Sequence, residues 1–420
     1  MRVLFFNDLH DRGLGSSIRQ MYQQAERLAE LGHESAIVST TEDPTEAGRT
    51  EIDGFRVFKV HSEYPFRLRA WVSVAKRGLV KEVGEILREW KPDVVHSHIV
   101  HTHLSYGSLT EAKRYGAGVV FTAHDAMTFC YHKLLCSHGG EENNWELKDY
   151  RAYWQKCIPC QRLRFRPGRN RVISKVLARD VDRITVVSDE LGDALRANGI
   201  RVDRRIHNAV RLREELPSAE MVAAFRARHG VEGNLLIAIG GRLNEQKGIK
   251  QLFEMLAILR NEFPTLRMLV MGDENLYRKG FEPAARKVGV ADLIVPTGWL
   301  GGEDLASAYG AIDVLVTPSI CFETFGLLNL EAMEFSKPVV ATSFGGCPEV
   351  VRDGVTGFTE NPFHIEKFAE RIAELLRDPE LRRRFGAAGR KAAEEYFSIE
   401  RLTDEFLEEY ETACRASASR

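Results

Sequence analysis

The chain has 420 residues and an ordinary globular composition, with 44% hydrophobic and 28% charged residues. This length suggests two or three domains, each with its own core. The formal net charge of −2 gives no overall signal for binding a polyanion, so we expect no nucleic-acid partner.

The first apolar run, VLFF, is too short for a secretory signal peptide and is not followed by a small-residue cleavage site. No apolar run approaches the ~18 residues that a membrane-spanning helix needs. We therefore expect a cytoplasmic protein, with peripheral contact at the cytoplasmic membrane face left open.

Short β-branched runs alternate with helical patterns along almost the whole chain. The predicted strands are VLFF, AIVST, VVHSH, VVFTAH and ITVVS in the first half and LLIAIG, RMLVMG, LIVPTG, VLVTPS and PVVATS in the second. Such strands, separated by amphipathic helices, are typical of parallel sheets covered on both faces. We predict an α/β protein with two doubly wound, Rossmann-like domains facing a central cleft, with ligands at the carboxyl ends of the strands.

The pattern also predicts domain limits. We expect an N-terminal domain over residues 1–210, a linker over 211–230, a C-terminal domain over 231–395 and a helix over 396–420 that packs back on the N-terminal domain. An insert at about 126–175 in the N-terminal domain is rich in cysteine and basic residues.

The loop GGRLNEQKG follows one predicted strand and precedes a helix. Its Arg242 and Lys247 would form a clamp for a diphosphate, with Gly241 keeping the loop flexible. A solvated, charged turn is the alternative.

The stretch FETFGLLNLE places Glu323 eight residues before Glu331. Two acids at this spacing would lie roughly 80° apart around one helix. The pair is therefore expected to act on one ligand only if Glu323 precedes the helix and Glu331 lies on it. Gly326 would let backbone approach that ligand closely. Two surface glutamates at a helix entrance are the alternative.

Near the N-terminus, GLGSS places Gly15 and Ser16 at the start of a predicted helix, whose dipole favours a phosphate group. The tight turn of any parallel βα unit explains these glycines equally well.

Together these motifs resemble the retaining glycosyltransferases of family 4, which have the GT-B fold. The resemblance covers nearly the whole chain and rests on E-x7-E at Glu323 and Glu331, GRLxxxKG, GGCPEVVRDGVTGF and the N-terminal GS…LAELGHE. The segment IHNAV is similar to the family's I-P-N-G-V hinge but departs from it at His207 and Ala209.

The resemblance implies transfer of a sugar from a nucleotide-diphosphate sugar to a hydroxyl group on a glycan or lipid-linked acceptor, by chemistry that needs no divalent metal. Arg242 and Lys247 would neutralise the diphosphate, Glu331 would hold the ribose and Glu323 the donor sugar. The other implied donor-binding positions are Gly15, Ser16, Gly241, Trp299, Leu300, Phe325, Gly326 and Leu327. We also expect His124 near the reacting face of the sugar, with Asp125 and His98 on the acceptor side. The alternative for His124 is a structural histidine at a strand end.

Two features of the insert suggest further partners. Residues 151–179 carry nine Lys or Arg side chains beside aromatic residues, which would suit an anionic lipid or, alternatively, only a solvated surface. Four cysteines follow the spacing C-x5-C-x20-C-x2-C, namely Cys130, Cys136, Cys157 and Cys160. This pattern suggests a structural zinc site, with two disulfides or four buried thiols as alternatives.

Other function classes stay open from the sequence alone. They are a non-catalytic nucleotide-sugar binder, an epimerase or hydrolase of the same fold, and a zinc-bearing scaffold. Consumption of donor with and without an acceptor would separate them.

Overall fold

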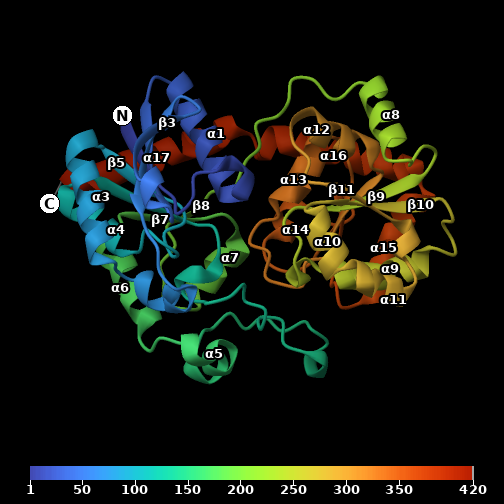
Figure 1. Ribbon diagram of the computed structural model, residues 1–420, viewed down its shortest axis with the longest axis horizontal. Helices are drawn as coiled ribbons and strands as arrows, with labels where there is room; N and C mark the ends of the chain where they lie inside the picture. Colours follow the sequence, from blue (N-terminus) through green and yellow to red (C-terminus); the bar gives the residue numbers. More distant parts are fainter. Residues whose placement is uncertain (419–420) are drawn as a thin grey trace. The chain divides into compact units, whose positions relative to one another are not determined.

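The computed structural model describes residues 1–418, apart from the side chains of Leu14 and Ser16. The chain divides into two compact units. The first comprises residues 1–134, 150–209 and 399–420, and the second comprises 135–149 and 210–398. Each unit contains one sheet flanked by helices (Figure 1).

The first unit has an eight-stranded sheet in the order β3-β4-β2-β1-β5-β6-β7-β8, parallel except for the antiparallel pair β3–β4. Its strands are β1 (Arg2–Phe6), β2 (Glu34–Thr41), β3 (Gly48–Ile52), β4 (Phe55–His61), β5 (Val94–Ser97), β6 (Gly118–Ala123), β7 (Arg183–Val186) and β8 (Arg204–Arg205). Its helices are α1 (Ser16–Glu30), α2 (Arg69–Val72), α3 (Arg77–Trp90), α4 (Gly107–Tyr115), α5 (Trp154–Gln161), α6 (Arg169–Asp180), α7 (Asp189–Arg196) and α17 (Ile399–Ala418).

The second unit has a six-stranded parallel sheet in the order β11-β10-β9-β12-β13-β14. Its strands are β9 (Leu235–Gly240), β10 (Leu266–Met271), β11 (Ile294–Gly298), β12 (Val314–Thr317), β13 (Val339–Thr342) and β14 (Gly357–Glu360). Its helices are α8 (Ala219–Arg228), α9 (Ile249–Leu259), α10 (Glu274–Gly280), α11 (Glu282–Val288), α12 (Gly302–Ala311), α13 (Leu327–Glu334), α14 (Cys347–Val350), α15 (Ile365–Arg377) and α16 (Pro379–Tyr396).

Both sheets have the long apolar strands that the sequence predicts. Strands β5, β6 and β13 are buried at every residue, because helices cover both faces. The core of the second unit joins Ile237 of β9 to Leu252 of α9 and Ile372 of α15. This packing holds the loops that follow the strands on a rigid frame.

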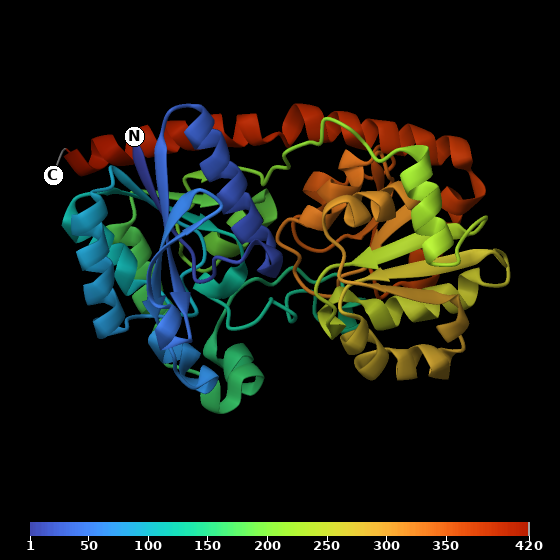
Figure 2. The same cartoon turned by 45° about the horizontal axis from the view of Figure 1, so that its top comes forward.

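The C-terminal helix α17 belongs to the first unit, where it lies beside α1 (Figure 2). Its Phe406 and Tyr410 join the core formed by α1 and the sheet. The Tyr410 hydroxyl is bonded to His96 Nδ1 at 2.7 Å and accepts a hydrogen bond from Gln24 Nε2 at 2.8 Å. These bonds join residues from three distant parts of the sequence.

Two details differ from the predicted organisation. The segment 211–230, predicted as a linker, contains α8, whose Phe225 is buried. Residues 135–149 of the insert lie with the second unit, because His138 and Trp145 stack on Phe344 and Phe363 there.

Among the helices of residues 1–418, none combines the length and apolar character needed to cross a bilayer.

Candidate active site

The strand order of the second sheet reverses between β9 and β12, which are hydrogen-bonded neighbours. The strands after β9 extend the sheet on one side, and those from β12 onward extend it on the other. Loops that leave such neighbours diverge and open a crevice at the carboxyl ends of the strands, the usual ligand position in this sheet type. The loop after β9 carries Arg242 and Lys247, and the loop after β12 carries Glu323.

Lys247 and Glu323 meet at this position. Lys247 Nζ lies 2.6 Å from Glu323 Oε2, which also accepts a hydrogen bond from the Ser319 hydroxyl at 3.1 Å. Burial alone would lower the pKa of Lys247, but the adjacent Glu323 carboxylate raises it above its ordinary value. Lys247 is therefore held as an ammonium group between the two loops.

Arg242 lies in the same loop as Lys247 and is exposed. Gly241 before it has φ 88°, a left-handed conformation that glycine adopts without strain. Within residues 1–418, no ion pair or hydrogen bond holds the Arg242 guanidinium. Its side chain is therefore available for an anion brought by a ligand.

Helix α13 begins at Leu327, so Glu323 precedes the helix and Glu331 lies on it, as predicted. No side chain caps the helix N-terminus, which leaves amide groups for a ligand anion. Gly326 at the cap has φ 85°, and an added Cβ would meet Asn329 Nδ2 at 2.6 Å. The Phe325 side chain is buried against Phe397, so only its backbone can face a ligand.

Glu331 is buried on α13, and its Oε2 accepts a hydrogen bond from the Tyr309 hydroxyl at 2.9 Å. Tyr309 lies on α12 and stacks on Phe335. This bond orients the carboxylate. Sequence reasoning missed Tyr309, because nothing in the local pattern of α12 distinguishes it from a core tyrosine.

Trp299 and Leu300 follow β11, which is the edge strand of the sheet. Trp299 is 56% exposed. Because β10 lies between β11 and β9, the loop that carries Trp299 and Leu300 leaves the sheet at a different place from the loops that carry Lys247 and Glu323.

The first sheet reverses its strand order between β1 and β5. At this point His98 Nδ1 and His124 Nε2 share a hydrogen bond of 2.7 Å. Burial lowers the pKa of His124 to about 4, against a smaller opposite effect of the Asp125 carboxylate. Burial also lowers the pKa of His98 well below its usual value. Both imidazoles are therefore neutral at pH 7.

Asp125 lies beside this pair and close to a third histidine. Its Oδ2 is 3.2 Å from His101 Nε2, and its Oδ1 accepts a hydrogen bond from the Met127 amide at 2.8 Å. Although burial opposes it, His101 and the Met127 amide hold the pKa of Asp125 below its usual value. Asp125 is thus an ionised carboxylate close to His124.

Sequence reasoning missed Asp8, which directly follows β1. Its buried carboxylate accepts hydrogen bonds from the amides of Thr102, His103 and Leu104 at 2.7–3.0 Å. These bonds fix the loop that follows β5. The polar run NDLHD, directly after a predicted buried strand, is the pattern that could have pointed to Asp8.

Gly15 caps α1, and no side-chain hydrogen bond closes that end of the helix. The amides at this N-terminus are thus available, as the prediction requires. The side chain of Ser16, also predicted to bind the donor, lies outside the described part of the chain.

Within residues 1–418 no group of three or more His, Cys, Asp or Glu side chains is arranged to hold a metal ion. Cys136 and Cys160 are exposed, and Cys130 and Cys157 are half-buried. Cys136 lies in the second unit and the other three in the first. The zinc site stays a prediction from the cysteine spacing.

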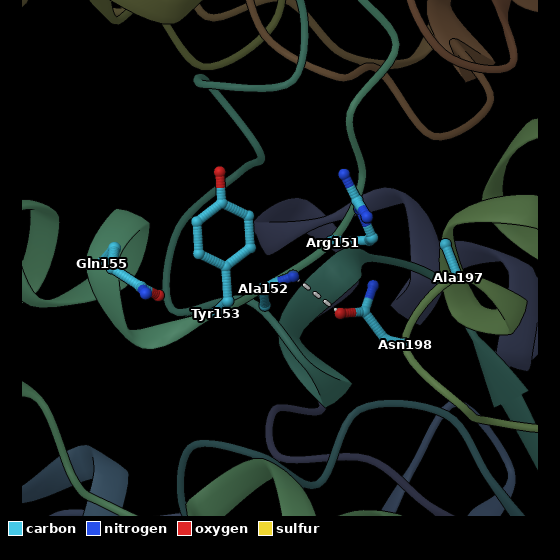
Figure 3. A pocket seen from close by; sticks show the side chains of 6 residues that line it. All are labelled: Arg151, Ala152, Tyr153, Gln155, Ala197 and Asn198. Atoms are coloured by element: carbon cyan, nitrogen blue, oxygen red, sulfur yellow. Dashed lines mark hydrogen bonds between the residues drawn. The ribbon is translucent and has the colours of Figure 1, made fainter.

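A hollow on the first unit lies where the chain re-enters that unit. Its lining is Arg151, Ala152, Tyr153, Gln155, Ala197 and Asn198 (Figure 3). Asn198 Oδ1 accepts a hydrogen bond from the Ala152 amide at 2.8 Å, and Asn198 Nδ2 donates to Tyr150 O at 2.9 Å. The hollow is open and contains none of the predicted site residues, so we give it no part in the reaction.

Comparison with known proteins identifies the family. The model for "Glycosyl transferase 4-like domain" matches residues 15–209, and the model for "Glycosyl transferases group 1" matches residues 222–392. The chain belongs to the family 4 type of GT-B glycosyltransferases. The predicted fold class is confirmed.

Similar proteins support this membership. The chain is 28% identical over 340 residues to EpsD of Bacillus subtilis (strain 168), described as a glycosyltransferase, covering 79% of each chain. It is 28% identical to the sulfoquinovosyl transferase SQD2 of Arabidopsis thaliana over 88% of this chain. It is 33% identical to the D-inositol 3-phosphate glycosyltransferase of Streptomyces scabiei over 54% of this chain. These matches span 65% of the plant protein and 53% of the Streptomyces protein.

Solved structures share the fold. A sucrose-phosphate synthase from Thermosynechococcus elongatus superposes with a TM-score of 0.77 at 19% identity, covering 99% of both chains. The Anabaena protein HepE, solved in complex with UDP and glucose, has a TM-score of 0.74 at 19% identity, with 98% of this chain and 100% of that chain covered.

Proposed function

We propose that this glycosyltransferase moves a sugar, with retention of anomeric configuration, from a nucleotide-diphosphate sugar to an acceptor hydroxyl. The observation that carries the proposal is the contact between Lys247 and Glu323 at the switch point of the second sheet. An ammonium group and a carboxylate placed side by side suit a ligand that has both a diphosphate and sugar hydroxyls.

The leaving diphosphate gains negative charge as the bond to the sugar breaks. Lys247 would meet this charge as a point cation, and the exposed Arg242 would meet it with a planar fork of N–H donors. The uncapped N-terminus of α13 would add amide donors to the same group. Catalysis of this kind is positioning and charge stabilisation, and it requires no divalent cation.

Glu323 and Glu331 would bind hydroxyl groups of the donor. Glu323 would accept hydrogen bonds from the sugar while its other contacts, with Lys247 and Ser319, keep the carboxylate oriented. Glu331 would accept them from the ribose, with Tyr309 fixing its orientation.

The acceptor side would be supplied by the first unit. A neutral His124 can donate or accept one hydrogen bond to a sugar hydroxyl, and its bond to His98 fixes its ring. The ionised Asp125 can accept a second hydrogen bond. In retaining transfer on the front face, the leaving phosphate itself would take the proton of the acceptor.

We also propose that the acceptor is lipid-linked and that the first unit contacts a membrane surface. The support is an aromatic–basic surface, defined as the exposed side chains of Phe66, Leu68, Trp71, Trp154 and Leu163 together with the exposed Arg67, Arg162 and Arg164. Its two segments adjoin, because the Arg166 guanidinium lies 4.6 Å from the ring centre of Trp71. Exposed aromatic groups among arginines suit the interface of an anionic bilayer.

The decisive experiment supplies UDP-glucose, the donor bound by HepE, and other nucleotide sugars with and without an acceptor extract. Donor consumption that requires the acceptor, with NMR showing the donor's anomeric configuration in the product, supports the proposal. Donor binding without consumption would indicate a non-catalytic binder. Consumption without an acceptor would indicate a hydrolase or an epimerase.

A further inference from the structure

Residues 135–149, here called the strap, belong to the second unit, although the chain on both sides of them belongs to the first. Two hydrogen bonds fold the strap on itself. They run from the Leu147 amide to His138 O at 3.1 Å and from the Asp149 amide to Ser137 O at 3.0 Å. The strap is therefore a closed loop and not an extended connection.

Aromatic rings fasten the strap to the second unit. The His138 ring stacks on Phe344 with centres 4.6 Å apart and planes 3° from parallel. Trp145 stacks on Phe363 at 4.1 Å and 15°. Asn361 Nδ2 also donates a hydrogen bond to Trp145 O at 3.2 Å. His138 is 4% exposed, so this contact is a packed one.

Phe344 stands in the turn that supports Glu323. The Gly346 amide donates a hydrogen bond to Glu323 O at 2.8 Å. Gly345 has φ 67°, and an added Cβ there would lie 2.1 Å from Glu323 O. The turn at 344–346 therefore contacts the backbone of Glu323 directly. A displacement of Phe344 would thus displace the backbone of Glu323.

We propose that His138 and Trp145 are positioning residues for Glu323. The strap packs on Phe344 and Phe363, these rings fix the turn at 344–346, and the turn fixes the backbone that carries the Glu323 carboxylate. The inference rests on the proposed function, because it assigns Glu323 a contact with the donor sugar. It adds that a segment of the N-terminal insert completes the donor site.

The test compares Trp145→Ala with Tyr153→Ala in the full-length protein. Tyr153 lies in the same insert, is 43% exposed, belongs to the first unit and lies outside the aromatic–basic surface, so its removal leaves the strap in place. A small displacement of a catalytic group costs on the order of 100-fold in rate, so we expect kcat to fall about 100-fold in Trp145→Ala. The affinity for the nucleoside diphosphate, measured by calorimetry, should fall much less than kcat, because the loop that carries Arg242 and Lys247 follows β9 and the turn at 344–346 follows β13.

Conservative variants separate positioning from general destabilisation. Trp145→Phe and His138→Phe keep a flat ring on Phe363 and on Phe344, and they should keep kcat close to that of the parent. His138→Ala should behave like Trp145→Ala. Equal losses in the Phe and Ala variants of both residues would overturn the proposal.

Hydrogen exchange gives a readout that does not depend on turnover. Amides of residues 343–346 should exchange faster in Trp145→Ala than in the parent and in Tyr153→Ala. Unchanged exchange with unchanged kcat would refute the positioning role while leaving the glycosyltransferase proposal standing. If the parent protein transfers no sugar, the proposed function fails, and the exchange rates still decide whether the strap holds the turn.

Discussion

The ammonium group of Lys247 lies 2.6 Å from the carboxylate of Glu323, although 76 residues separate them in the chain. Their loops leave β9 and β12, which are neighbours in the sheet only because its strand order reverses there. Each charge therefore holds the other in place before any ligand arrives. In the proposed mechanism, a bound diphosphate gives Lys247 a second anion, and the Glu323 carboxylate would then bind sugar hydroxyls.

Glu323→Ala should lower kcat by about 100-fold, or roughly 3 kcal/mol, because one positioned contact to the transition state is lost. The circular dichroism spectrum should match that of the parent, since Glu323 lies in a loop. Near-normal turnover in this variant would remove Glu323 from the proposed mechanism.

Lys247→Ala should weaken binding of the nucleoside diphosphate and reduce turnover, because the clamp loses its half-buried cation. Calorimetry with the diphosphate measures the first effect directly. Lys250→Ala is the matched control, since Lys250 lies three residues away and pairs only with the exposed Glu245 in the described contacts. Equal affinities of the two variants would count against the clamp.

Acidification should destabilise the protein in part through His124. Its pKa is about 4 in the folded chain against 6.5 unperturbed, so the unfolded state binds more protons between these values. The contribution of His124 to the free energy of unfolding is therefore complete above pH 6.5 and decreases as the pH falls toward 4. His124→Gln should show a shallower fall of Tm over this range. An identical pH profile in both proteins would contradict the neutral state of His124.

The reaction should continue in excess EDTA, because the proposed mechanism assigns neutralisation of the diphosphate to Arg242 and Lys247. An assay with chelator, followed by added Mg²⁺, tests this. Complete loss of activity that Mg²⁺ restores would refute metal-independent transfer.

The four cysteines of the insert should bind about one zinc ion per chain, in a structural role that leaves no open coordination position. Elemental analysis of protein purified without a His-tag measures the metal content. Absence of metal together with four titratable thiols would refute zinc binding at these cysteines.

Binding to vesicles that contain anionic lipid should depend on the aromatic–basic surface and should weaken as salt is raised. Leu163→Ser should reduce co-sedimentation with such vesicles. Leu276→Ser removes an exposed leucine of the second unit, 44% exposed against 102% for Leu163, and should have no effect. Equal binding by both variants would exclude Leu163 from a membrane contact.

The local sequence pattern was sufficient to predict most of the strands and the start of one helix. All ten strands predicted from apolar runs are present, because a strand buried on both faces needs an unbroken apolar sequence. The start of α13 between Glu323 and Glu331 also followed from spacing alone. The hairpin β3–β4 was missed, although Asp53 and Gly54 at its turn are a recognised hairpin signal, because β3 is short and exposed.

Sequence by itself determined the fold class, the two sheets and the residue types that each loop offers, since these depend on patterns within a few neighbouring residues. Only the tertiary structure decided which of those residues meet. The His98–His124 bond, the orientation of Glu331 by Tyr309 and the stacking of His138 on Phe344 all join elements that are far apart in the chain. Such contacts follow from strand order and helix packing, which the whole core sets, and no local pattern encodes them.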